Sequence, residues 1–131
     1  MKLTDTEKIT INVGPIDLGQ IDLLVLEGFY SNRTDLIRTA IRNQLETHAD
    51  VVRESSHRRT LVLGLQDYSR RDLEAVRRAG KKLRIRVLGL VRIAADVPPA
   101  LASATIESIV VLGALQASPA VKAALADRIH T

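Results

Sequence analysis

Cysteine and tryptophan are absent from this chain of 131 residues, and aromatic residues make up only 2% of it. Without cysteine the chain can form neither a disulfide framework nor a thiolate metal site. With so few aromatic rings, the core must be built from aliphatic side chains. No apolar run reaches the roughly 18 residues that a membrane span needs, and the polar start MKLTDTEK does not resemble a signal peptide. These absences predict a soluble cytoplasmic protein without a membrane partner.

Recognisable catalytic and metal-binding motifs are also absent. The three histidines, His48, His57 and His130, are scattered along the chain. Single glycines within apolar stretches do not form a phosphate-binding loop. We therefore expect no enzyme activity, no cofactor and no metal site.

Charge is unevenly distributed, although the net charge is only +4. Residues 1–50 hold 5 Lys/Arg against 8 Asp/Glu, a net charge of −3, and residues 51–92 hold 12 against 4, a net charge of +8. Residues 93–131 hold 2 against 3, a net charge of −1. The basic middle segment indicates either a polyanionic partner or a solvated helix face.

The stretch KITINV at positions 8–13 alternates between polar and apolar side chains, which is typical of a strand with one buried face. Two helical stretches follow. The first begins after the break at Gly14-Pro15 and ends near Gly28, a plausible helix C-cap. The second has Ser31 or Asn32 as its N-cap, with an acid at Asp35, and its apolar spacing extends to about residue 56.

Together these elements resemble the ribbon-helix-helix family of DNA-binding proteins, the class of Arc, MetJ and the CopG-type repressors. The resemblance covers residues 8–47 and is most specific in the stretch GFYSNRTDLIRTAIR. In this family the strand pairs antiparallel with the same strand of a second subunit, and the resulting ribbon enters the DNA major groove. Elementary physics favours the same dimer, because a unit of about 40 residues has too little core to fold alone.

The resemblance implies a role for each set of residues. The polar face of the ribbon would contact DNA bases through Lys8, Thr10 and Asn12. The start of the second helix would bind backbone phosphate through Ser31, Asn32, Arg33 and Thr34, where free N–H groups and the helix dipole favour an anion. The dimer core would contain Ile9, Ile11, Val13, Leu24, Ile37 and Ile41. Two alternatives stay open: Lys8 contacts a phosphate instead of a base, and Arg33 pairs with Asp35.

The remainder of the chain contains an internal repeat. The word VLGL occurs at positions 62–65 and 87–90, and VLGA follows at 111–114. Each copy lies in a β-branched stretch and precedes a helical one, with a period of 24 to 25 residues. One strand and one helix per period predict a short parallel sheet in a leucine-rich-repeat-like solenoid. The fold class is therefore α/β overall.

This organisation predicts three parts: residues 1–50 as the DNA-binding and dimerisation domain, 51–57 as a linker or helix extension, and 58–131 as a three-unit strand-helix repeat domain. The last strand, in residues 106–115, has one charged residue and should form an exposed apolar edge, which tends to pair with another chain. We expect residues 58–131 to mediate higher homo-oligomers. The basic residues in 58–92 would contact flanking DNA or the acidic helices of a neighbouring subunit.

Three functions remain in view. The first is a nucleoid-associated, sequence-specific transcriptional regulator. The second is an antitoxin that represses its own operon, although the apolar, patterned C-terminal part differs from the disordered charged tails usual in such antitoxins. The third is a scaffold that polymerises through its repeat domain and is anchored to DNA by its ribbon.

Overall fold

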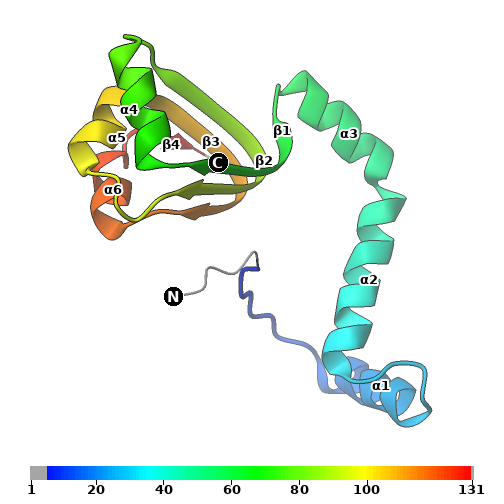
Figure 1. Ribbon diagram of the computed structural model, residues 1–131. Helices are drawn as coiled ribbons and strands as arrows, with labels where there is room; N and C mark the ends of the chain where they lie inside the picture. Colours follow the sequence, from blue (N-terminus) through cyan, green and yellow to red (C-terminus); the bar gives the residue numbers. More distant parts are fainter. Residues whose placement is uncertain (1–5, 131) are drawn as a thin grey trace. The chain divides into compact units, whose positions relative to one another are not determined.

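The computed structural model describes residues 6–130, in which six helices and four strands are present (Figure 1). The chain divides into two units, Thr6–Ser55 and a second unit that begins at Ser56. Of the two predicted domains, 1–50 and 58–131, residues 1–5 and 131 lie outside the described part. The mixed α/β class is confirmed.

The first helix, α1 (Pro15–Leu26), begins and ends where the sequence indicates. Gly14 is its extended N-cap and a proline occupies the first turn, where a missing N–H costs nothing. At the other end, Gly28 has φ of 85°, and its N–H donates to the carbonyl of Val25 at 3.1 Å. The N–H of Phe29 donates to the carbonyl of Leu24 at 3.0 Å, which completes the usual glycine-terminated helix end.

The second helical stretch is divided in two. Helix α2 (Arg33–Thr47) ends at His48, whose φ of −103° and ψ of 14° interrupt the helix, and α3 (Ala49–Arg58) follows directly. Residues 51–57, for which the sequence leaves a linker or a helix extension open, lie within α3. The interruption at His48 is not visible in the apolar spacing.

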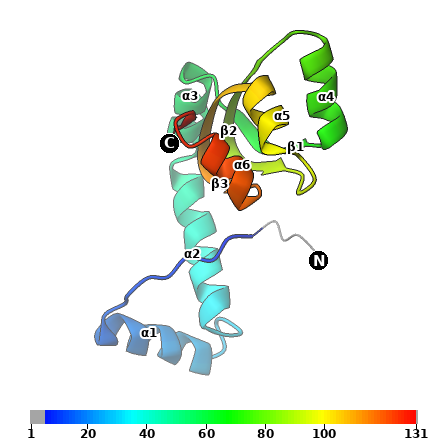
Figure 2. The same cartoon turned by 90° about the vertical axis from the view of Figure 1, so that its left-hand side faces the viewer.

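The second unit is a parallel sheet with helices between its strands. The elements, in chain order, are β1 (Val62–Tyr68), α4 (Arg70–Arg78), β2 (Leu83–Ile93), α5 (Pro99–Thr105), β3 (Ile106–Gln116), α6 (Pro119–Ala124) and β4 (Ile129–His130). The strands lie in the order β1-β2-β3-β4, and every neighbouring pair is parallel. Helices α4, α5 and α6 lie on one face of the sheet in both views (Figures 1 and 2).

The three copies of the repeated word lie side by side in the sheet. Val62 pairs with Val87 and Val87 with Val111, and the glycines two residues later are in the same register. The predicted short parallel sheet is therefore confirmed. A leucine-rich-repeat-like solenoid would go beyond these four strands and stays a prediction.

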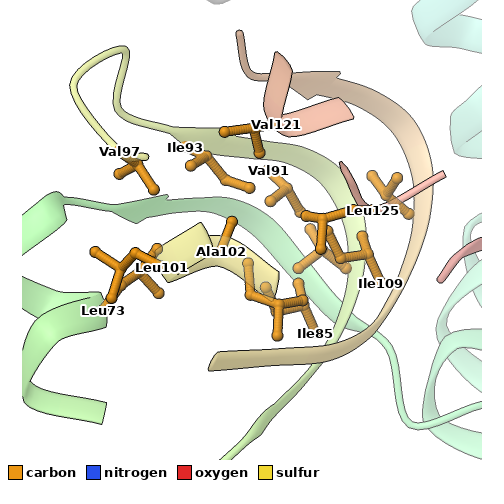
Figure 3. Close-up of a cluster of buried hydrophobic side chains, with 13 residues drawn as sticks. Leu73, Ile85, Val91, Ile93, Val97, Leu101, Ala102, Ile109, Val121 and Leu125 are labelled. Atoms are coloured by element: carbon orange, nitrogen blue, oxygen red, sulfur yellow. The ribbon is translucent and has the colours of Figure 1, made fainter. Parts of the chain in front are cut away.

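The hydrophobic core lies between the sheet and its helices (Figure 3). Leu73 of α4, Val121 of α6 and Leu125 contact the inner side chains of the strands, and all three are fully buried. The fully buried members of this cluster are all aliphatic, as the shortage of aromatic residues requires, and Tyr68 packs against them partly buried. Leu90 is also buried but lies outside this cluster, because alternate residues of a strand face opposite sides of a sheet.

The expectation that the third apolar strand ends the sheet is wrong. The two-residue strand β4 follows it and pairs with Ile109 and Val110 of β3. Ile106 and Ile109 are fully buried, so the first half of β3 is not an exposed edge. Leu112 is 39% exposed, and the second half of β3 has no strand beside it on the β4 side within the described residues.

Candidate nucleic-acid interface

The segment that should form the ribbon has no regular secondary structure in the single chain. Lys8, Thr10 and Asn12 are exposed there. The apolar residues between them are exposed too, with Ile9 at 75% and Ile11 at 62%. One copy of this segment therefore offers neither a partner strand nor cover for its apolar side chains, so the predicted ribbon depends on a second chain.

The same shortage of cover extends through the whole first unit. No residue from Thr6 to Ser55 is buried, and α1 and α2 contain no buried residue. Large apolar side chains remain open to water on both helices, including Leu24 at 37% and Ile41 at 45%. Burial of apolar surface is the dominant favourable term in folding. A unit of this size without a core is thus incomplete as a monomer.

The start of α2 is held by a reciprocal cap. The backbone N–H of Asp35 donates to Oδ1 of Asn32 at 2.8 Å, and the N–H of Ser31 donates to Oδ2 of Asp35 at 3.0 Å. Of the two predicted N-caps, Asn32 is the one observed. N–H groups in the first turn of a helix have no acceptor within that helix. Those of Arg33 and Thr34 consequently point out of the helix, where a phosphate could accept from them.

Arg33 has a partner that local sequence does not suggest. Its Nε and Nη2 atoms donate to Oδ1 and Oδ2 of Asp22 in α1, at 2.8 Å and 2.9 Å. The alternative pairing with Asp35 is wrong, because the carboxylate of Asp35 accepts from Ser31 instead. The bidentate hydrogen bond from Arg33 holds the pKa of Asp22 below its usual range and raises the pKa of Arg33. This ion pair joins α1 to the first turn of α2.

The ion pair also bears on the predicted phosphate site. A paired guanidinium contributes little net charge, so an incoming phosphate would compete with Asp22 for Arg33. Both side chains are about half exposed, at 55% and 47%, so the competition takes place in contact with water. Of the acids in α1, Asp22 is thus held by Arg33 at the start of α2.

Several residues of the basic middle segment are engaged within the second unit. Arg70 pairs with Glu74 at 3.0 Å, and Arg84 pairs with Glu107 of the neighbouring strand. Arg86 donates to the carbonyl oxygen of Arg59 at 2.8 Å and 3.1 Å. A further basic set is exposed on and after α4, at Arg71, Arg77, Arg78, Lys81 and Lys82. Contact with flanking DNA and contact with a neighbouring subunit both stay open for this set.

Comparison with known protein families shows which family the chain belongs to. Residues 4–122 match the model of the Ribbon-Helix-Helix transcriptional regulator family. The chain belongs to this family. Membership of the Ribbon-Helix-Helix regulators indicates a DNA-binding role in transcription. Curated proteins and solved structures yield no significant match to the chain.

The extent of the family match is larger than the resemblance in the sequence. The resemblance ends at residue 47, whereas the match continues through the sheet to residue 122, inside α6. The matched residues therefore include strands β1, β2 and β3 as well as the helices of the resemblance. Short apolar strands carry no family-specific residues comparable with GFYSNRTDLIRTAIR, and this is why the sequence did not indicate it.

No group of three or more His, Asp or Glu side chains within residues 6–130 could hold a metal ion. None of the helices in this range combines the length and the apolar composition needed to cross a bilayer.

Proposed function

We propose that this Ribbon-Helix-Helix protein is a sequence-specific transcriptional regulator that reads DNA with a dimeric β-ribbon. Residues 8–13 of two chains pair antiparallel, and the ribbon enters the major groove, which is wide enough for it. The observation that carries the proposal is the absence of any buried residue between Thr6 and Ser55 in a chain of this family. A second copy supplies both the missing strand partner and the missing core.

The two faces of the ribbon have separate tasks. Ile9, Ile11 and Val13 cover the helices of the dimer. Lys8, Thr10 and Asn12 face the bases, where lysine donates to guanine O6 and N7 and asparagine pairs with adenine through two hydrogen bonds. Ser31, Asn32, Arg33 and Thr34 hold the flanking phosphate and thereby fix the register of the ribbon on the duplex.

The second unit, in this proposal, joins dimers into a larger assembly on DNA. Several half-sites bound together gain avidity without any new base contact. Its well-packed core distinguishes it from the disordered tail that an antitoxin would fold on its toxin, so the regulator is the better supported function. A nucleoid location follows from the DNA partner.

A binding assay with matched variants tests the reading role. A duplex is first selected from a random pool by the full-length protein. Asn12→Ala should reduce affinity for this duplex by about 1–3 kcal/mol and relax specificity at one position per half-site. Asn43→Ala, the same change at an exposed position of α2, should leave binding intact. Equal binding by both variants would refute the ribbon as the reader.

A further inference from the structure

Three glycines cross the sheet in one row. Gly64, Gly89 and Gly113 pair in register on β1, β2 and β3, with φ of 133°, 141° and 125°, a region that only glycine adopts readily. A Cβ atom added at Gly89 would overlap the carbonyl oxygen of Gly64, and one added at Gly113 would overlap the carbonyl oxygen of Gly89. Each of these two glycines therefore makes room for the carbonyl of the strand before it.

Gly64 has the same conformation without such a neighbour. No atom lies within 4 Å of a Cβ added there, because β1 is the first strand of the sheet. By analogy with the other two glycines, its open side is the outer edge of β1. That edge has the space for a carbonyl oxygen, and no other strand of the second unit lies beside it.

The exposure of β1 indicates that a strand is missing beside it. The words at 62–65 and 87–90 are identical, yet Val62 is 51% exposed and Val87 only 1%. Leu65 is likewise 44% exposed, against 8% for Leu90. Strand β2 has a neighbouring strand on both sides, whereas β1 has one on a single side. An edge strand with the apolar sequence of a central strand is prone to pair with another chain.

At the other edge of the sheet, the open part of β3 matches β1 in length. Strand β4 pairs with β3 only at Ile109 and Val110, which leaves positions 111–116 open on that side within the described residues. If the register of the sheet continued, the partners of 109 and 110 on a further copy of β1 would be residues 60 and 61. Thr60 has φ of 55° and β1 begins only at Val62, so β4 fills the two positions that β1 would leave empty.

The hydrogen-bonding groups of the two edges also match. The N–H of Ile109 donates to Arg128 at 2.9 Å, so alternate residues of β3, including Gly113, direct their backbone groups away from β2. The carbonyl of Tyr68 accepts from Ala94 at 3.0 Å, so alternate residues of β1 from 62 to 68 face β2. Leu63, Leu65 and Asp67 consequently present their N–H and C=O groups at the outer edge.

We propose that β3 of one copy pairs in parallel with β1 of the next copy, with Gly113 beside Gly64. The carbonyl oxygen of Gly113 then occupies the space at Gly64, and the register continues as Val111 with Val62 and Leu112 with Leu63. This contact is the molecular form of the assembly in the proposed function and rests on that part of it. It joins two different edges, so it propagates head to tail into a ring or an open chain of copies.

Engineered cysteines test the register directly, because the natural chain contains none. Leu63 is 74% exposed and Leu112 is 39% exposed. In the proposed contact they are neighbours on adjacent strands, about 4.8 Å apart and within the range that a disulfide spans. Full-length Leu63→Cys and Leu112→Cys chains are mixed, oxidised and separated by mass. The expected result is a cross-link between the two variants that neither variant forms alone.

Other cross-linking patterns would overturn the contact. A product from Leu63→Cys alone would indicate two β1 edges pairing with each other or two sheet faces stacking. A product between Leu63→Cys and Leu88→Cys would indicate stacked faces, because β2 has no open edge. The contact would also be overturned if the mixture of Leu63→Cys and Leu112→Cys yields no product at a concentration where the natural protein is larger than a dimer.

Leu65→Pro provides a second measurement. Proline removes one N–H that faces the open edge and no hydrogen bond to β2. We expect loss of the larger assembly down to the ribbon dimer, with the circular dichroism of the sheet retained. A folded variant with the natural mass would overturn the contact, and if the variant does not fold, the cysteine mixtures still decide.

A natural protein that is a simple dimer at every concentration contradicts assembly itself, whereas a larger assembly with the wrong cross-links contradicts this contact only.

Discussion

The guanidinium of Arg33 donates to both carboxylate oxygens of Asp22, at 2.8 Å and 2.9 Å. This pair links α1 and α2 of the first unit and occupies the arginine that the family resemblance assigns to phosphate. If Arg33 binds phosphate as proposed, phosphate and Asp22 compete for the same donors, and this competition can be measured.

Asp22→Asn should strengthen binding to DNA. The change releases Arg33 for phosphate and removes a negative charge near the duplex, so the slope of log affinity against log salt should steepen by about 0.9 for one added phosphate contact. The measurement is a salt titration of affinity. Asp17→Asn is the matched control, since it removes the same charge from α1 without breaking this pair. Equal slopes for the two variants would contradict a phosphate role for Arg33.

Substitutions at two neighbouring positions should distinguish the functions of the two faces of the ribbon. Both variants are made in the Leu65→Pro background, which leaves only the ribbon contact between chains. Ile11→Glu places a carboxylate in the proposed dimer core, where an unpaired charge is costly, and should yield a monomer that does not bind DNA. Asn12→Glu changes the polar face and should leave the dimer intact while it loses DNA affinity. Sedimentation gives the mass of each variant. Two dimers, or two monomers, would mean that residues 8–13 do not divide into a core face and a DNA face.

The glycine row should be sensitive to a single methyl group. Gly89→Ala places a Cβ against the carbonyl of Gly64 at a φ of 141°, so we expect a loss of about 3 kcal/mol or more in the stability of the sheet unit. Gly19→Ala is the control, because it lies inside α1 with no atom within 4 Å of the added Cβ. That change should stabilise the helix by about 0.5–1 kcal/mol. Urea unfolding followed by circular dichroism distinguishes the two, and a stable Gly89→Ala protein would contradict the close approach of the strands.

Acid should weaken the sheet unit below about pH 5. Hydrogen bonds from Ser69, first from its backbone N–H, hold the pKa of Asp72 below its usual range, and the hydrogen bond from Arg84 does the same for the pKa of Glu107. A carboxyl whose pKa is lower in the folded state stabilises the fold above its unfolded pKa, near 4. That stabilisation is lost as the pH falls through the folded pKa. Urea midpoints should therefore stay level from pH 7 to about pH 5 and then fall, and Asp72→Asn should reduce the fall.

The local parts of this fold could be predicted from sequence. The break at Gly14-Pro15, the helix end at Gly28 and the cap at Asn32 depend on neighbouring residues alone, and all three are confirmed. The parallel sheet was also predictable, because the repeated word placed its strands. Each of these features can be recognised either from residues that are close in the chain or from a sequence that repeats at a regular interval.

What the sequence did not indicate depends on contacts between distant residues. Arg33 and Asp22 are 11 positions apart on different helices, and no local pattern selects Asp22 over Asp35. Strand β4 has two residues, too few for any alternation, and it exists because Arg128 and Ile109 meet at the end of the sheet. The ribbon itself needs a second chain, so its pairing and its DNA contacts stay predictions.

Methylation interference on a selected duplex tests the central claim most directly, because it reports which groove the protein reads. Dimethyl sulfate methylates guanine N7 in the major groove and adenine N3 in the minor groove. A ribbon that presents Lys8, Thr10 and Asn12 to major-groove edges predicts that methylation at guanine N7 within each half-site blocks binding. Interference confined to adenine N3 would place the contact in the minor groove and contradict the account.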